Sequence, residues 1–300
     1  MCILKKVKVM RVMRINKMNI DLSHKFWINL GVMLFLLVPA CLIYPVNLQT
    51  LLNKWFLFDE SYGHGLIIIG LIVFEIIKRA ELPNLQVPNI KNASGCLLGV
   101  LGCYGISYVA ALHEIELAGQ FAFYGTWVFL LAGAFSFSIW RILFFPLSFF
   151  IFAIPIWDLL NPILVNLTSV AVSSAVEPLR LVVYIEENII EMPFGTLVIA
   201  DSCSGLRYLI VGLAIAVYAL KDSHLPFLTK VKMVILAFIL SIIANWVRVF
   251  ALVLIAYYSD MESSLVVDHD GFGIVLFFVL FLPFFPLLTK LEKSTTPQQP

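Results

Sequence analysis

The sequence carries very little charge for its length. Only 13% of its 300 residues are charged, whereas 61% are hydrophobic. An ordinary soluble domain has about 25% charged residues. The composition therefore excludes an ordinary soluble globular protein and leaves no room for a separate soluble domain.

Several familiar motifs are also missing. The sequence has no Walker-type loop, no zinc-ligand spacing and no haem motif, so we predict neither a cofactor nor a metal. It has no internal repeat either, whereas many secondary transporters are built from two related halves with broken helices. These absences count against nucleotide-driven, metal-dependent and repeat-based transport functions.

What the sequence does have is a series of long apolar runs. About eight of them are close to the length needed to cross a bilayer. We expect spans near 26–45, 64–79, 95–112, 117–139, 142–160, 203–220, 231–258 and 271–289. The sequence thus predicts an all-α polytopic integral membrane protein in which residues 26–289 form one membrane domain.

The basic residues are distributed unevenly around these runs. Sixteen of the 20 Lys and Arg residues precede the first span or follow the second, fourth, sixth and eighth. By the positive-inside rule these segments face the cytoplasm, so residues 1–25 and the tail 290–300 are both predicted to be cytoplasmic. The basic N-terminal tract most simply contacts anionic lipid headgroups rather than nucleic acid. Glu75 is interpreted as an inner-boundary residue that reaches the headgroups.

Residues 161–202 form the largest predicted outer segment. Polar residues recur at helical spacing on an otherwise apolar stretch, at Asn166, Ser169, Ser173, Glu177 and Arg180. This pattern is typical of a helix that lies in the membrane interface, and Pro178 should end or kink it. Two β-branched runs follow, at 181–185 and 196–200, and we expect either a hairpin-like lid or an irregular loop leading into Cys203.

The five cysteines do not form a disulfide framework. Cys2 is predicted to be cytoplasmic, and Cys41, Cys96 and Cys103 fall in predicted spans. Only Cys203 lies at the predicted outer surface. An isolated thiol that faces an oxidising compartment is a candidate reactive residue.

Arg248 lies deep inside the apolar run 231–258. A guanidinium inside a membrane costs several kcal/mol and cannot lose its proton, so it is tolerated mainly where it faces a polar site. Cys203 and His269 begin the neighbouring runs, which places all three in the outer half of the membrane. Together they could serve as nucleophile, oxyanion stabiliser and proton carrier. Taken singly, Cys203 and His269 could equally be structural residues.

Four short motifs resemble those of a known family. In chain order they are Ser61-Tyr-Gly-His-Gly65, Cys203-Ser-Gly-Leu-Arg207, Asn245-Trp-Val-Arg248 and His269-Asp-Gly-Phe-Gly273. The last three resemble the signature motifs of the exosortase/archaeosortase family, and the first resembles its N-terminal element. The third signature departs from the family pattern at Phe272, where tyrosine is usual, and at Ile274, where tryptophan is usual.

The resemblance implies an integral-membrane cysteine transpeptidase. By motif, Cys203 corresponds to the nucleophile, Arg248 to the group that stabilises or orients the oxyanion, and His269 to the acid or base. The supporting residues would be His64, Ser204, Gly205, Arg207 and Asn245. The clients would be membrane-anchored proteins with a C-terminal sorting signal, made of a Pro-Glu-Pro-like motif, a membrane helix and a basic cluster. The acceptor would be an amine or a glycolipid.

Two other functions stay open from the sequence. Arg248 could bind an anion in a transporter or channel, or the chain could be a non-catalytic membrane protein of exopolysaccharide assembly. The leading hypothesis places a multi-pass protein in the inner membrane, with Cys203, Arg248 and His269 facing the periplasm. Lipid and client proteins would be its partners, and nucleic acid would not.

Overall fold

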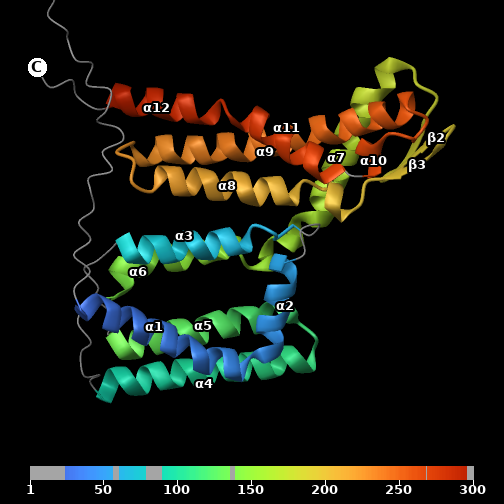
Figure 1. Ribbon diagram of the computed structural model, residues 1–300. Helices are drawn as coiled ribbons and strands as arrows, with labels where there is room; N and C mark the ends of the chain where they lie inside the picture. Colours follow the sequence, from blue (N-terminus) through green and yellow to red (C-terminus); the bar gives the residue numbers. More distant parts are fainter. Residues whose placement is uncertain (1–23, 57–60, 79–89, 136–138, 268, 296–300) are drawn as a thin grey trace, which may run out of the picture.

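The computed structural model describes residues 24–56, 61–78, 90–135, 139–267 and 269–295. Two groups of helices lie side by side, one from each half of the chain, and most of their helices share one direction (Figure 1). A small sheet projects at one end of the second group. The predicted helical membrane architecture is thus confirmed in its broad form.

The first group comes from the N-terminal half. Within it, α4 packs against α5, α1 against α5, and α3 against α6. Its described helices are α1 (His24–Ile43), α2 (Pro45–Phe56), α3 (Gly65–Lys78), α4 (Ile90–Leu112), α5 (Glu116–Phe135) and α6 (Ile139–Phe149). α2 is bent by 106° from the preceding helix and lies across the end of the group (Figure 1).

The second group comes from the C-terminal half. Its centre is α9, which packs against α7, α8 and α11. The described helices are α7 (Asn161–Val176), α8 (Leu206–Leu220), α9 (Phe227–Tyr258), α10 (Ser264–Val267), α11 (His269–Phe281) and α12 (Phe284–Thr295). Because α9 contacts all the other α-helices of this group, it is the element that can bring their residues to one site.

The predicted count of about eight spans is not confirmed. Within the described residues, six helical segments are long and apolar enough to cross a membrane, and the bent pair α1–α2 would make a seventh. The predicted span 64–79 is a shorter apolar helix. The orientation of the termini stays a prediction.

The predicted continuous span 142–160 is wrong. α6 ends at Phe149, a 3₁₀ turn η2 (Phe150–Phe152) follows, and a second 3₁₀ segment η3 begins at Pro155. Ile154 has extended dihedrals, φ −91° and ψ 138°, because a proline disfavours the helical conformation of the residue before it. The chain therefore turns here rather than continuing as one helix.

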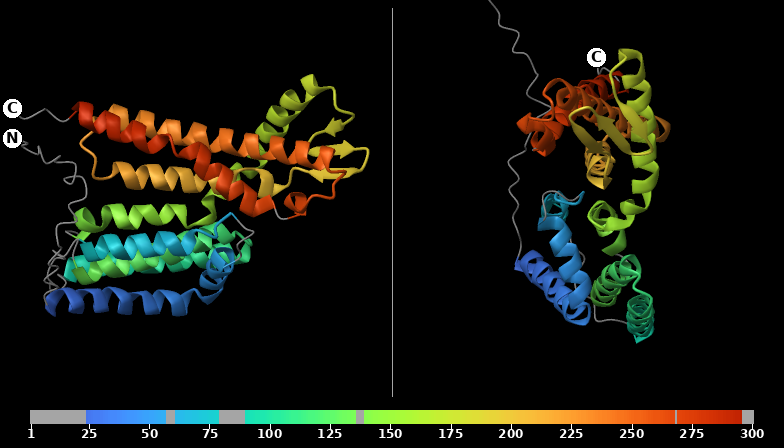
Figure 2. Two further views of the ribbon diagram at one scale, coloured as in Figure 1. Left: turned by 45° about the horizontal axis from the view of Figure 1, so that its top comes forward. Right: turned by 90° about the vertical axis from the view of Figure 1, so that its right-hand side faces the viewer.

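α7 differs in orientation from the other long helices. The segment Pro155–Leu179 has the length and composition of a span, yet α7 within it runs obliquely across the ends of α8 and α9 (Figure 2). The predicted placement of this helix in the membrane interface stays a prediction. As predicted, the α-helix ends before Pro178, in a 3₁₀ turn η4 (Glu177–Leu179) followed by a left-handed Arg180.

The predicted hairpin is instead a three-stranded antiparallel sheet. β1 (Tyr184–Glu186) pairs with β2 (Ile189–Met192), and β2 pairs with β3 (Gly195–Val198). The middle strand was not predicted because it is short, with only Ile189 and Ile190 ahead of Glu191 and Met192, whereas the runs on either side are longer. Ile190 at the centre of β2 is fully buried, which joins the sheet to the apolar cluster around Cys203.

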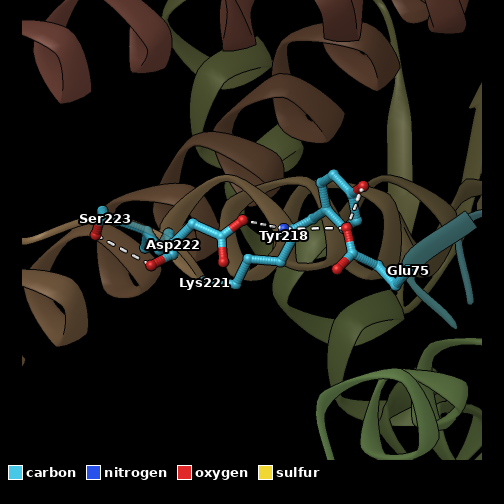
Figure 3. Close-up of polar contacts among 6 residues, drawn as sticks. Glu75, Tyr218, Lys221, Asp222 and Ser223 are labelled. Atoms are coloured by element: carbon cyan, nitrogen blue, oxygen red, sulfur yellow. Dashed lines mark hydrogen bonds and ion pairs between the residues drawn. The ribbon is translucent and has the colours of Figure 1, made fainter. Parts of the chain in front are cut away.

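A buried ion pair joins the two groups at the end opposite the sheet (Figure 3). Lys221 Nζ lies 3.0 Å from Glu75 Oε1, and the Tyr218 hydroxyl donates a hydrogen bond of 2.9 Å to the same oxygen. Lys221 also pairs with Asp222. Glu75 is only 2% exposed, so its interpretation as a headgroup-facing residue is wrong. It is a buried contact from α3 to the end of α8.

Candidate active site

Cys203 closes a 3₁₀ turn, η5 (Asp201–Cys203), directly before α8. Its backbone N–H donates to the Ala200 carbonyl at 2.8 Å. The Cys203 side chain is 8% exposed and belongs to the same apolar cluster as Val249 of α9. Because Asp201 and Ser202 are exposed, the cysteine lies just beneath the surface at this end of the molecule.

Gly205 allows the turn to approach α9 closely. Its φ is +90°, which side chains other than glycine rarely adopt. A Cβ atom on Gly205 would lie 2.6 Å from Asn245 Cγ. The glycine is therefore required both by the backbone conformation and by the contact with Asn245.

Asn245 holds the Cys203 turn from α9. Its side-chain amide is 1% exposed and donates to the Cys203 carbonyl at 2.9 Å and to Thr168 Oγ1 at 3.2 Å. The Thr168 hydroxyl in turn donates to the Ser204 carbonyl at 3.3 Å. The turn is thereby hydrogen-bonded to α7 and α9 at once, which fixes the main chain around the thiol.

Ser204 stabilises the start of α8 through hydrogen bonds of its hydroxyl. Its hydroxyl donates to Asn161 Oδ1 at 2.8 Å and accepts a hydrogen bond from the Leu206 N–H at 3.2 Å. Ser204 is 2% exposed, and its bond with the Leu206 N–H is buried, so this bond is made in a dry environment where it strengthens. The serine thus satisfies one of the open N–H groups of the helix start.

Arg248 is the largest of the side chains that are almost fully buried, at 1% exposure. One of its Nη atoms lies 3.5 Å from the Ser202 carbonyl, and its Cζ lies 5.4 Å from the centre of the Tyr208 ring. A carbonyl oxygen and an aromatic face both favour a guanidinium. Arg248 follows Asn245 by three residues, so one face of α9 presents both side chains to consecutive carbonyls of the Cys203 turn.

Gly273 brings α11 against Arg248. A Cβ on Gly273 would lie 2.1 Å from the Tyr208 hydroxyl and 2.5 Å from Arg248 Nε. His269 begins α11 and precedes Gly273 by four residues, so both lie on one face of that helix. The side chain of His269 lies outside the described part of the structure, whereas its backbone starts the helix that packs on Arg248.

Arg207 and His64 lie on a different side of the site. They line a pocket of about 230 Å³ together with Tyr208 and apolar residues of α3 and α11. A second pocket of about 320 Å³ shares His64 and extends the first toward Tyr218. The two pockets form an apolar groove between α3 and α8, which begins beside Tyr208 and runs toward the buried ion pair.

His64 is held at the mouth of this apolar groove. Its Nε2 lies 2.9 Å from the Phe152 carbonyl, and Tyr62 stacks on its ring. Burial lowers the pKa of His64, opposed in part by that hydrogen bond, so the imidazole is neutral near pH 7. His64 therefore shapes the entrance to the groove and carries no charge there.

The structure thus assembles most of the predicted site. Cys203, Ser204, Gly205, Asn245 and Arg248 form one hydrogen-bonded and packed unit. Thr168, Asn161 and Tyr208 also belong to this unit and were not predicted from the sequence. A threonine in an apolar helix is common, because its hydroxyl can donate to the backbone of the same helix. Nothing in the sequence therefore marked Thr168 as a residue of the site.

Comparison with models of protein families identifies the family of this chain. The model of the transmembrane exosortase family matches residues 53–286, which is more than half of the chain. The chain belongs to the transmembrane exosortase family. The match includes the Cys203 turn, the Asn245–Arg248 segment of α9 and the start of α11. Searches of curated proteins and of solved structures found no match.

Proposed function

We propose that this exosortase-family protein is a cysteine transpeptidase that cleaves C-terminal sorting signals at the outer face of the inner membrane. Cys203 is the nucleophile, Arg248 stabilises the developing oxyanion, and His269 carries the proton. The observation that carries the proposal is the pair of contacts from one face of α9. Asn245 bonds the carbonyl of Cys203, and Arg248 reaches the carbonyl of Ser202.

The reaction follows the chemistry of other acyl transfers through a thiol. The Cys203 thiolate attacks the scissile carbonyl carbon, and negative charge moves onto the carbonyl oxygen. The C–N bond then breaks, His269 gives a proton to the leaving amine, and the client is left as a thioester on Cys203. A buried guanidinium beside the turn stabilises the oxyanion strongly because little water screens it.

The apolar groove supports a client that remains in the membrane. It lies between α3 and α8, is lined mostly by apolar side chains such as Ile67, Val211 and Phe278, and begins next to Arg207 and Tyr208. A helix of the client seated along it would present its outer end to the Cys203 turn. Inner-membrane location and access from the periplasm belong to the same proposal.

The test uses purified protein in nanodiscs and a synthetic client that carries the tripartite signal. The wild-type protein should release the C-terminal helix and show a mass increase on Cys203 when the acceptor is left out. Cys203→Ala should do neither, while its thermal unfolding should match that of the wild type, because only the sulfur is lost and the thiol is not in a disulfide.

Cys103→Ala is the matched control. Cys103 is also a buried free cysteine, in α4, and its removal should leave cleavage unchanged. Normal processing by Cys203→Ala would overturn the proposal and favour a non-catalytic role in exopolysaccharide assembly. Saturable anion uptake by liposomes holding the protein, abolished by Arg248→Gln, would favour the transporter hypothesis instead.

A further inference from the structure

A polar cleft lies beside the Cys203 turn, on the side of α2 and α5. It consists of two pockets of about 380 and 330 Å³ that share Lys54 and Asp158. The side chains of these two residues form an ion pair of 3.0 Å. Because the pockets meet at this pair, they form two parts of one cleft, which is separate from the apolar groove between α3 and α8.

Gln120 is the most informative residue of the polar cleft. It lines the larger pocket from the first turns of α5 and is only 1% exposed. Among the described residues, no hydrogen-bond partner lies within reach of its amide oxygen or its amide nitrogen. A buried amide left in this state costs about 1–3 kcal/mol for each unsatisfied group. The donor and the acceptor of Gln120 are thus available to a ligand.

The charges of the polar cleft favour a cation. The charged residues that line it are one lysine and three carboxylates, namely Lys54, Glu116, Asp158 and Asp201. Tyr62 lines the smaller pocket and is 1% exposed. Burial and the charge of Asp158 raise the pKa of Tyr62, so its hydroxyl stays protonated and can donate a hydrogen bond.

The polar cleft reaches the turn that carries Cys203. Asp201 and Ser202 line its smaller pocket and immediately precede Cys203. Asn161 lines the same pocket and accepts the hydrogen bond from Ser204. A ligand in the cleft would therefore lie against the turn that carries the thiol, on the side away from the apolar groove.

We propose that the polar cleft binds a polar ligand with a primary amine, and that this ligand is the acceptor of the transferred client. Gln120 holds a neutral polar group of the ligand through its amide. The carboxylates of the cleft attract the amine as a cation and deliver it to the Cys203 turn. The identity of the ligand as an acceptor rests on the proposed function, whereas its binding does not.

The transfer step is balanced without a further reactant. A carboxylate of the polar cleft first accepts one proton from the bound ammonium. The neutral amine nitrogen then attacks the thioester carbonyl, the C–N bond forms and the C–S bond breaks. The second proton, which the nitrogen loses as the amide forms, passes to the sulfur of Cys203, which returns as the thiol. The client leaves as an amide of the ligand.

Binding is measured first, on purified Cys203→Ala protein in phosphatidylcholine nanodiscs, so that no turnover interferes. Glycinamide and glycolamide are the two probes, since they differ only in an amine against a hydroxyl group. Glycinamide should bind at least about tenfold more tightly, which is about 1.4 kcal/mol. Equal binding of the two probes, or no binding of either, would overturn the proposal.

Variants then locate the site. Gln120→Leu removes the buried amide and should raise the Kd of glycinamide about tenfold, as expected for lost hydrogen bonds. Glu116→Gln should raise it about threefold through the lost carboxylate. Glu114→Gln is the matched control. It removes the same charge from an exposed residue just before α5 that does not line the cleft, so the Kd should not change. Equal effects of the two glutamate variants would show that only general surface charge matters, and would overturn the proposal even if Gln120→Leu failed to fold.

Two further measurements are made. One distinguishes a lipid amine from a soluble amine, and the other distinguishes the proposed amine site from the proposed function. Phosphatidylethanolamine in the nanodisc should compete with glycinamide if the natural ligand is a lipid headgroup, and should have no effect if it is a soluble amine. Amine binding without any cleavage by the wild-type protein would overturn the proposed function and leave the site standing. Cleavage without selective amine binding would overturn the site and leave the function standing.

Discussion

Two buried charged residues of this protein make different kinds of contact. Glu75, near the C-terminal end of α3, meets the ammonium of Lys221 at 3.0 Å and a tyrosine hydroxyl, and so joins the two helix groups (Figure 3). Arg248, in α9, contacts a backbone carbonyl of the Cys203 turn and the face of Tyr208. The contacts of Glu75 join the two helix groups, whereas these contacts of Arg248 join α9 to the Cys203 turn and to α8.

The difference indicates what each charge is for. An ion pair between two elements neutralises both partners and favours one arrangement of the helices. The contacts of Arg248 place its guanidinium beside the Cys203 turn, where an oxyanion would form. We therefore interpret the Glu75–Lys221 pair as structural and Arg248 as part of the reaction site.

The sharpest test of this comparison is Arg248→Lys, which keeps the charge. The client-cleavage rate should fall about 10²–10³-fold, as for loss of one oxyanion donor, because an ammonium lacks the planar fork of the guanidinium. Single-turnover cleavage in nanodiscs measures the effect, with thermal unfolding as the control for folding. A near-normal rate would show that Arg248 only balances charge, as Glu75 does.

Removing the Glu75–Lys221 pair should produce the reverse pattern, with stability lost and cleavage kept. Lys221→Met leaves the Glu75 carboxylate buried without its cation and should lower the free energy of unfolding by about 3 kcal/mol. The double variant Glu75→Gln/Lys221→Met should recover most of that loss. Cleavage per folded molecule should stay near the wild-type rate in both, and a large loss of rate in the double variant would contradict the structural interpretation.

Gly205→Ala should affect both stability and rate. The left-handed conformation costs a residue with a side chain about 1–2 kcal/mol, and the new Cβ would displace Asn245. Gly102→Ala is a suitable control, since a Cβ there meets no atom within 4 Å. Unfolding in detergent and single-turnover cleavage are the measurements, and equal stability of the two variants would contradict the predicted strain.

The smallest expected effect concerns pH at the mouth of the apolar groove. Burial lowers the folded-state pKa of His64 below its unfolded value of about 6.5. The unfolded chain therefore binds the proton more readily, and stability should decline as the pH falls below about 6.5. His64→Gln should flatten this part of the stability profile, measured as Tm between pH 5 and 8. An unchanged slope would show that His64 is not the titrating group.

The parts of the site that could be predicted are those with an unusual residue type for their surroundings. Arg248 and Cys203 stood out because a membrane segment excludes charge and an outer surface rarely carries a lone thiol. Thr168 and Asn161 did not stand out, since a hydroxyl or an amide near a helix start has many ordinary uses. Hydropathy is averaged over a run of residues. It therefore did not reveal the turn of the chain at Pro155 or the short strand β2.

The sequence by itself determined the membrane class, the family motifs and the residues with chemistry. It did so because long apolar runs and a charge within one of them are energetically unusual wherever they occur. Only the tertiary structure decided that Asn245 and Arg248 reach consecutive carbonyls of the Cys203 turn, that Glu75 is paired, and that an apolar groove and a polar cleft approach the turn from two sides. These features depend on how helices distant in sequence pack, and helix packing is not encoded in any single run of residues.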